Sequence, residues 1–354
     1  MQQFLAAQAS SNSSSTAAAP PAPSPLRSRP PRSREQQSIV IKEATMADEH
    51  HELTKAFSGL GGLGVEESAL VSALGRWRKQ PEKRSQFRQG FPGFFTPAGT
   101  MERCSDEYVR HLKTEFSRFK NLMVLWAMHP WERDARWAHR ALHKKHHPAA
   151  VLVELACTRT ADELLGARRA YHALYHRSLE EDVAYRLKDK ENHLLVGLVA
   201  AYRYEGPRVN DDLAKEEANA LAAAKPHNEL MVVRVIATRS KPQLRATFRM
   251  YEKINGKPLE DDFGGGDSPC LREAVRCLDS PPKYFAEVIA DALKDGADKQ
   301  AKAALTRVVV SRSDADMEEI KEAYLKQHGA KLVDAVTKNT HGHYRDALLA
   351  MIGK

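Results

Sequence analysis

The sequence predicts an all-α protein built from four similar helical repeats. Long runs rich in Ala, Leu, Glu, Lys and Arg follow Met46. Short segments that contain Gly, Pro or Asp interrupt these runs, as in helices joined by turns. One pattern also recurs with a period of about 75 residues, which indicates a repeat protein rather than a set of unrelated domains.

The recurring pattern is an apolar run that ends in an arginine flanked by small or hydroxyl residues. It occurs at Thr158-Arg159-Thr160, Thr238-Arg239-Ser240 and Ser311-Arg312-Ser313. Each arginine is followed 12 residues later by a tyrosine and 20 residues later by a leucine, namely Tyr171, Tyr251, Tyr324, Leu179, Leu259 and Leu332. The apolar runs alone are compatible with strands, but flanks such as 164–174 and 317–325 space their apolar residues as helices do.

The first element in chain order is an extension over residues 1–45, rich in Ser, Ala, Pro and Arg and without an acid before Glu35. It has too few large apolar side chains to offset its ordering entropy by burial, so we predict that it is disordered. Its composition resembles an organelle transit peptide, whereas Met46 opens an ordinary start. Organelle targeting and an upstream extension of the coding start both stay open.

Four repeats follow the extension. We place them at residues 50–128, 130–204, 209–281 and 283–354. The first is the most divergent, with an apolar run at 69–74 and a closing run at 121–126. It carries an insertion over 90–104, which we place in a loop. Pro130 suits the first turn of the helix that opens the second repeat.

Charge and composition narrow the class of protein. The 54 Lys+Arg against 46 Asp+Glu give a net charge of +8, which favours an anionic partner but does not choose between nucleic acid and lipid. Mean hydropathy is −0.53, and apolar runs such as 194–201 are far shorter than the roughly 18 residues of a spanning helix, which argues against a transmembrane protein. Four cysteines without a CxxC pair favour a reducing, cytoplasmic setting.

Specific stretches of the repeats resemble the annexin family, and plant annexins in particular. They are residues 125–135, 156–160, 170–175, 179–183 and 202–206, and the resemblance runs from about residue 50 to the C-terminus. It implies five short helices in each repeat, a curved disc, and calcium-dependent, peripheral binding to anionic phospholipid through loops on the convex face. It also implies a non-enzymatic cytoplasmic protein in calcium and stress signalling, with actin or another annexin among the partners to consider.

The segment from Leu60 to Val65, with glycines at positions 61, 62 and 64, is the best calcium candidate. Glycines allow positive φ, so several carbonyl oxygens can converge on Ca²⁺, which takes about six to eight oxygen ligands. Matched to the family's loop, the carbonyl donors are Leu60, Gly62 and Gly64, the capping acid is Glu115, and the membrane contact at the loop tip is Leu63. The competing interpretation is a glycine turn that only joins two helices.

This segment departs from the family pattern in two ways. Val65 replaces the usual Thr, and Glu115 lies 51 residues beyond Gly64, about ten more than usual because of the insertion over 90–104. We therefore expect a calcium site in repeat 1 with an affinity that the sequence does not define.

Repeat 4 resembles a degenerate calcium repeat. Its loop reads Asp295-Gly296-Ala297-Asp298 where a glycine loop is expected, and His343 stands in the acid position. Calcium prefers oxygen ligands to imidazole, so we expect no standard site there. A weaker second site at Asp295, Gly296 and Asp298 is the alternative to a solvated turn. Repeats 2 and 3 lack the glycine loop altogether.

Two further groups of side chains have alternative interpretations. Cys157 and Cys277 match cysteines for which a redox role is suggested in plant annexins, but simple burial of small apolar side chains is the favoured interpretation. Four histidines, His139, His143, His146 and His147, lie at near-helical spacing. We favour a solvated basic helix end over a zinc site, since no cysteine or carboxylate completes a known zinc spacing.

The alternative function is a helical-repeat scaffold that binds protein or RNA through basic faces, with a vestigial calcium site. Nucleic acid is the less favoured partner, because the repeats contain no RNA-binding motif and no strongly single-signed stretch. Val233-Arg234-Val235 loosely resembles an actin-binding proposal for some annexins, but packing of an apolar helix is the favoured interpretation. We expect no enzymatic activity.

Overall fold

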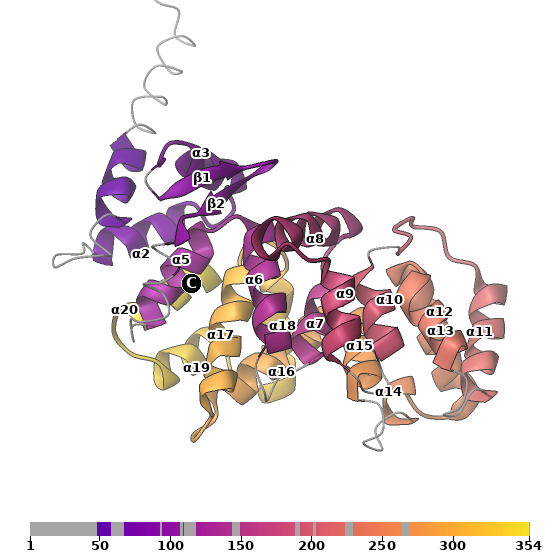
Figure 1. Ribbon diagram of the computed structural model, residues 1–354. Helices are drawn as coiled ribbons and strands as arrows, with labels where there is room; N and C mark the ends of the chain where they lie inside the picture. The colour runs from indigo at the N-terminus through magenta and orange to yellow at the C-terminus, as the bar shows by residue number, and fades with distance from the viewer. Residues whose placement is uncertain are drawn as a thin grey trace, which may run out of the picture. The chain divides into compact units, whose positions relative to one another are not determined.

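The computed structural model describes residues 48–57, 67–92, 94–106, 109, 118–143, 149–187, 192–200, 203–223, 229–262 and 269–353. The chain divides into two units, Met1–Ala47 and Asp48–Lys354, and all described residues belong to the second. The extension that we predict to be disordered therefore lies outside the described residues. Figure 1 shows the second unit as an assembly of short helices with one small hairpin, which confirms the all-α class.

The helices of the last three repeats follow one another in sets of five. Repeat 2 contains α6 (Pro130–His143), α7 (Ala149–Thr158), α8 (Ala161–Tyr175), α9 (Leu179–Arg186) and α10 (Asn192–Val199). Repeat 3 contains α11 (Asp211–Ala223), α12 (Glu229–Thr238), α13 (Lys241–Asn255), α14 (Leu259–Asp262) and α15 (Pro269–Asp279). Repeat 4 contains α16 (Pro281–Leu293), α17 (Lys299–Arg312), α18 (Met317–His328), α19 (Leu332–Asn339) and α20 (Gly342–Ile352).

The described part of repeat 1 combines helices with a pair of strands. Its elements are a helix over 48–57, α2 (Glu67–Arg76), α3 (Pro81–Gln89), β1 (Phe95–Ala98), β2 (Met101–Cys104) and α5 (Arg118–Ala127). No helix among the described residues is both long and apolar enough to cross a membrane.

The recurring arginine motif joins the helices within a repeat. Arg159 donates from Nε and Nη2 to the two oxygens of Asp134 at 2.6 and 3.0 Å, and Arg239 pairs with Glu217 at 2.6 Å, so each ties the second helix to the first. Thr160, which follows Arg159, begins α8 through a capping box in which it accepts from the third backbone N–H of the helix. The motif therefore marks helix junctions.

The later tyrosine and leucine of the pattern also have structural partners. The hydroxyl of Tyr171 donates to Asp182 at 2.6 Å, and that of Tyr251 donates to Asp262 at 2.5 Å, which links the third helix to the fourth. The leucines open the fourth helix of their repeats and are buried, namely Leu179, Leu259 and Leu332. The offset of 20 residues from arginine to leucine thus spans the third helix of a repeat and the turn that leads to the fourth.

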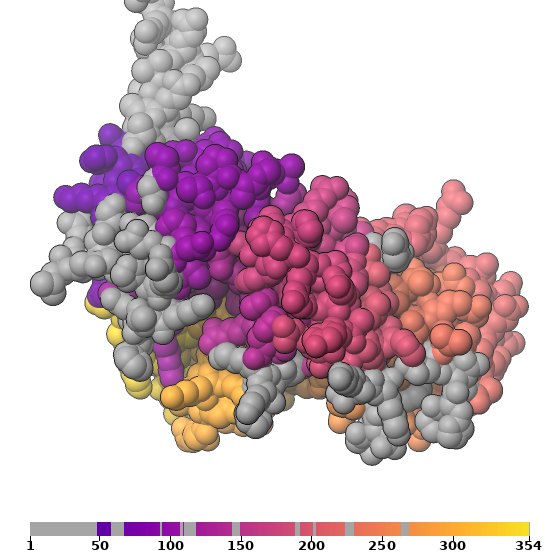
Figure 2. Space-filling model, in the orientation of Figure 1, coloured from indigo at the N-terminus to yellow at the C-terminus, as the bar shows by residue number. Residues whose placement is uncertain are grey.

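The insertion over 90–104, which we placed in a loop, instead forms an antiparallel hairpin of β1 and β2. Phe95 and Cys104 pair with each other and are buried, Met101 beside the turn is buried as well, and all three belong to the hydrophobic core. Gly99 has φ of +65° and supplies the left-handed conformation that a tight hairpin turn favours. Figure 2 shows the purple surface around this insertion continuous with the magenta surface of repeat 2.

Polar contacts hold the first and second repeats against the fourth. Arg78 donates to the backbone oxygen of Ser313 at 3.2 Å, and Arg84 pairs with Asp314. Between repeats 2 and 4, Arg307 donates from Nε and Nη2 to the two carboxylate oxygens of Glu154. α2 and α5 also pack on α20, which brings the chain's last helix beside repeat 1 (Figure 1).

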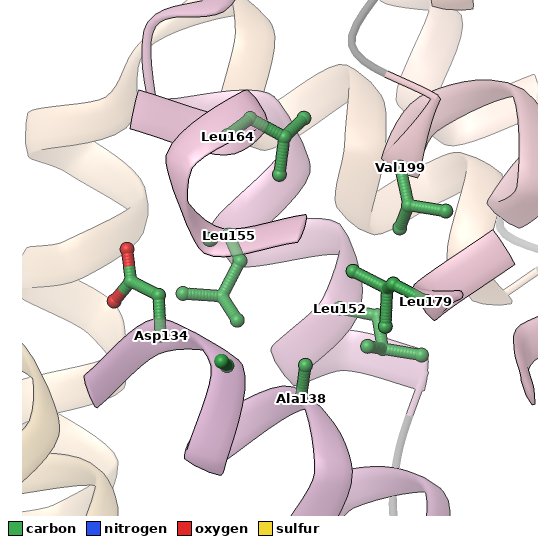
Figure 3. A pocket seen from close by; sticks show the side chains of 9 residues that line it. Asp134, Ala138, Leu152, Leu155, Leu164, Leu179 and Val199 are labelled. Carbon is green, nitrogen blue, oxygen red and sulfur yellow. The ribbon is translucent and has the colours of Figure 1, made fainter. Parts of the chain in front are cut away.

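The core of repeat 2 encloses a small cavity of about 10 Å³, room for about one water molecule (Figure 3). Leu152, Leu155, Leu164 and Val199 face it, whereas the carboxylate of Asp134 points away from them. A cavity this small and apolar holds no ligand, so any binding site lies elsewhere.

Candidate calcium and membrane site

The predicted calcium ligands of repeat 1 lie outside the described residues. This applies to Leu60, Gly62, Gly64 and Glu115, and to the predicted membrane contact Leu63. The structure does describe what flanks them, because α2 begins at Glu67 and α5 begins at Arg118. The assignment of these ligands stays a prediction, and the flanking residues carry the structural argument.

The insertion that lengthens the chain between Gly64 and Glu115 contains the β1–β2 hairpin. Phe95 lies directly opposite Cys104 in the register, so the inserted chain leaves and returns at one place. Residues opposite each other in an antiparallel pair have Cα atoms only about 5 Å apart. The insertion therefore adds length to the chain without separating the elements on its two sides.

The hairpin is also fastened to its surroundings. Glu102 accepts from Nε of Arg88 at 3.0 Å and from Gln89 at 3.1 Å, both in α3. The backbone N–H of Cys104 donates to the buried carboxylate of Glu132 in α6 at 2.8 Å. The hairpin is thus attached to α3 of its own repeat and to α6, the first helix of repeat 2.

A side chain of repeat 4 lies against the described flanks of the repeat-1 loop. Nε2 of His343, in the first turn of α20, is 2.6 Å from Oε2 of Glu67, the first residue of α2. The imidazole ring also lies 6.0 Å from the ring of Phe119 in α5. The residue in the acid position of repeat 4 therefore contacts both elements that flank the predicted calcium ligands.

The loop of repeat 4 contains a hydrogen-bonded turn followed by a helix cap. The carbonyl of Lys294 accepts from the N–H of Ala297 at 3.1 Å, and Gly296 has φ of +77°, which closes a tight turn. Oδ1 of Asp298 caps α17 by accepting from the N–H groups of Gln300 and Ala301 at 2.9 and 2.7 Å. Asp298 therefore uses one carboxylate oxygen as a helix cap, and the weaker second site at this loop stays a prediction.

No second metal centre is visible among the described residues, where no three His, Cys, Asp or Glu side chains gather as metal ligands would. Asp295, Gly296 and Asp298 supply only two carboxylates, one of which is the helix cap. His139 and His143 stack with ring centroids 3.8 Å apart, and His139 also stacks on Tyr175 at 3.7 Å. His146 and His147 lie outside the described residues.

Both cysteines that match plant annexins are buried, as the favoured interpretation predicts. Cys157 lies in α7 and Cys277 in α15, and neither side chain reaches solvent. Burial raises the pKa of Cys157 to about 11, and burial together with the neighbouring Cys157 raises the pKa of Cys277 well above its usual value. Since the thiolate is the reactive form, these environments disfavour thiol chemistry near neutral pH.

Two features escaped the sequence interpretation. The contact between His343 and Glu67 has no sequence signal, since it joins residues far apart in the chain. The ion pair between Glu154 and Arg307 does have a sequence signal. Glu154 stands inside the apolar run from Val151 to Leu155, and a buried acid needs a partner.

The arrangement of helices and the recurring motif have clear relatives. The sequence model of the family described as Annexin matches residues 133–198, 214–275 and 284–351. Annexin D4 of Arabidopsis thaliana is 44% identical over 313 residues, which cover 85% of this chain and 97% of the relative. Annexin Gh1 of Gossypium hirsutum is 37% identical over 322 residues, which cover 87% and 96%.

Solved structures agree with these relatives. The structure titled annexin III superimposes with a TM-score of 0.74 at 26% identity, covering 87% of this chain and 94% of that chain. The fold is thus that of a helical protein built from annexin-type repeats. The chain belongs to the annexin family, and its relatives place it with the plant annexins. Annexins in general bind phospholipid membranes peripherally and in a calcium-dependent way, and are not enzymes.

Proposed function

We propose that this protein binds anionic phospholipid through one Ca²⁺ held in repeat 1. The carbonyl oxygens of Leu60, Gly62 and Gly64 and the carboxylate of Glu115 hold the ion, and a lipid phosphate completes its shell. Leu63 meets the acyl boundary beside the ion. In this proposal calcium bridges the Glu115 carboxylate and the lipid phosphate, which repel each other in its absence.

The closed hairpin is the observation that most supports the ligand set. The sequence puts Glu115 about ten residues too far from the loop by the family's spacing. Because Phe95 and Cys104 stand opposite each other, the residues between them drop out of the effective spacing. The interval from Gly64 to Glu115 then comes closer to the family's spacing between the loop and its acid.

The donor chemistry fits calcium and leaves room for lipid. Three carbonyls and a bidentate carboxylate supply five oxygens, and Ca²⁺ takes about six to eight, so about one to three positions stay available for phosphate and water. Repeat 4 adds no standard site, since the Lys294 carbonyl and the Asp298 carboxylate are already engaged. We therefore expect one calcium to govern binding, without the cooperativity of several sites.

The protein's net charge of +8 adds a contribution that does not need calcium. A basic side chain close to an anionic bilayer contributes about 1 kcal/mol, and this contribution falls as salt rises. A fraction of the binding is therefore expected to persist in chelator at low salt and to vanish at high salt.

Vesicle sedimentation tests the proposal. The full chain is mixed with phosphatidylserine–phosphatidylcholine vesicles across a calcium series at fixed physiological salt. We expect sedimentation with calcium, release by EGTA, and a strong loss in Glu115→Gln. Glu322→Gln is the matched control, because Glu322 is an exposed acid on α18 of repeat 4. Equal sedimentation with and without calcium would contradict the bridging mechanism.

The alternative function is a scaffold that binds protein or RNA while its calcium site is vestigial. The repeat-4 loop favours it, because His343 stands in the acid position and Asp298 serves as a helix cap. It predicts RNA or protein binding that falls steeply with salt, together with lipid sedimentation that calcium does not change. Actin or another annexin as partner belongs to this alternative.

We place the protein in the cytoplasm, moving to membranes when calcium rises, with a role in calcium and stress signalling. Residues 1–45 leave organelle targeting as the competing location. Comparing the location of the full chain with that of a chain starting at Met46, each fused to a fluorescent protein at its C-terminus, separates the two.

A further inference from the structure

We propose that Thr96 is a phosphorylation site for a proline-directed protein kinase and that Arg103 binds the phosphate once it is attached. This inference goes beyond the proposed function, because it concerns the β1–β2 hairpin and not the calcium loop. Thr96 is directly followed by Pro97, the arrangement that such a kinase reads. The acceptor is thus the Thr96 hydroxyl, and the phosphoryl donor is ATP.

The Thr96 hydroxyl lies where a kinase can reach it. Thr96 and Pro97 are the two exposed residues of β1. The hydroxyl donates to the backbone oxygen of Arg103 at 3.5 Å, whereas a typical O–H···O bond is about 2.5–3.0 Å long. Attaching a phosphate to this oxygen therefore gives up only a weak hydrogen bond and buries no charge.

The backbone around Thr96 already has the form that a proline-reading pocket requires. Thr96 lies in a strand, and a residue before proline favours this extended conformation. Pro97 has no N–H, so a pocket can pack on its ring without leaving a buried donor unpaired. Within the described part of the chain β1 pairs only with β2, so no further strand covers its other edge. A kinase can therefore bind this strand without unfolding the hairpin.

A cation stands opposite the acceptor. Thr96 and Arg103 are direct partners in the strand register, and such partners have Cβ atoms about 4.5–5.5 Å apart on the same face. Nη2 of Arg103 now donates to the two carboxylate oxygens of Asp106 at 2.7 and 2.8 Å. A phosphate carries about −1.5 to −2 charges at pH 7 and accepts paired bonds from a guanidinium, so it outcompetes a single carboxylate for Arg103. The hairpin thus contains a receptor for the phosphate as well as the hydroxyl that accepts it.

The other serine residues that precede proline do not show this combination where the structure describes them. Ser280 is partly buried, and its N–H donates to the backbone oxygen of Arg276 in α15. The backbone oxygen of Ser280 accepts from the N–H of Tyr284 in α16. Its backbone therefore belongs to a junction of two helices and cannot lie extended in a kinase. Ser24 and Ser268, which also precede prolines, lie outside the described residues.

The reaction is a balanced phosphoryl transfer. Oγ1 of Thr96 forms a bond to the γ-phosphorus of ATP as the bond between that phosphorus and the oxygen bridging to the β-phosphate breaks. ADP leaves, and the hydroxyl proton passes to the catalytic aspartate of the kinase. The product places a phosphate on the hairpin surface, where it binds Arg103 and draws the guanidinium away from Asp106.

Phosphorylation of the full chain tests the acceptor. The protein is incubated with a purified, active mitogen-activated protein kinase and Mg²⁺-ATP, and the sites are mapped by mass spectrometry. We expect phosphate on Thr96, none at this position in Thr96→Val, and a loss of about tenfold or more in Pro97→Ala. Thr100→Val is the matched control, because Thr100 is exposed in the same turn and no proline follows it. An unmodified Thr96, or equal modification of Thr96 in Pro97→Ala, would overturn the assignment.

Phosphorus NMR of the phosphorylated protein tests the receptor. The phosphate resonance is followed through its second ionisation near about pH 6. The Arg103 guanidinium favours the dianion, so the second pKa of the phosphate should be lower in the wild-type protein than in Arg103→Gln by about 0.2–0.7. Arg272→Gln, which removes an exposed arginine of α15, should leave this pKa unchanged. Equal pKa values in the wild-type protein and Arg103→Gln would show that Arg103 does not bind the phosphate.

Discussion

Replacing Arg307 by Met should cost about 3–5 kcal/mol of unfolding free energy, because it leaves the carboxylate of Glu154 buried and unpaired. In the native protein Nη2 and Nε of Arg307 lie 2.9 and 3.0 Å from the two oxygens of Glu154. The Glu154 side chain is fully buried and that of Arg307 is 15% exposed, so water screens the pair little. Burial alone lowers the pKa of Arg307, but the Glu154 carboxylate outweighs it and raises that pKa above its usual value.

Urea unfolding followed by tryptophan fluorescence measures the loss. The double variant Glu154→Leu with Arg307→Met should recover most of it, since replacing both buried charges by apolar side chains is often neutral or stabilising. Arg345→Met is the matched control, because Arg345 pairs with Asp346 at the surface, where such pairs contribute at most about 1 kcal/mol. A loss in Arg307→Met no larger than in Arg345→Met would refute the buried-charge reasoning.

Two further predictions concern the helix junctions of repeat 2. Gly166→Val should lower stability by about 1–3 kcal/mol in thermal or urea unfolding, because a Cβ there would overlap the indole of Trp131; Gly75→Ala, with ordinary space around it, should not. Burial alone raises the pKa of Asp182, but hydrogen bonds from Tyr171 and Arg177 outweigh it and lower that pKa. A depressed pKa stabilises the folded state at pH values above the unfolded pKa of about 4. Asp182→Asn should therefore lower the free energy of unfolding most at pH 7 and progressively less toward pH 3. An equal loss at both pH values would contradict this.

The sequence predicts local features of this fold well because they repeat at helical spacing. The offsets alone identify Arg159, which lies between α7 and α8, and Tyr171, which lies within α8 and bonds to Asp182 of α9. The hairpin was missed because Gly90, Pro92 and Gly93 are loop signals and its strands are only four residues each. Such short strands show little alternation, and their burial depends on aromatic neighbours in α3.

Contacts between repeats cannot be predicted from residue offsets along the chain. Glu154 and Arg307 belong to repeats 2 and 4, and His343 and Glu67 to repeats 4 and 1, so no offset along the chain connects them. The sequence indicates that Glu154 needs a partner but does not identify it. The calcium ligands of repeat 1 rest on the glycine loop and on family spacing, and the structure contributes the described flanks and the closed hairpin.

The hairpin has a consequence for how calcium motifs are recognised in other chains. A search that requires a fixed number of residues between a glycine loop and its acid rejects this protein, although the strands return the chain to the place where it left. Counting across the hydrogen-bonded rungs instead of along the covalent chain shortens the interval from Gly64 to Glu115 toward the family spacing. Degenerate spacing in a repeat is therefore weak grounds for declaring its metal site lost when the extra residues can pair with each other.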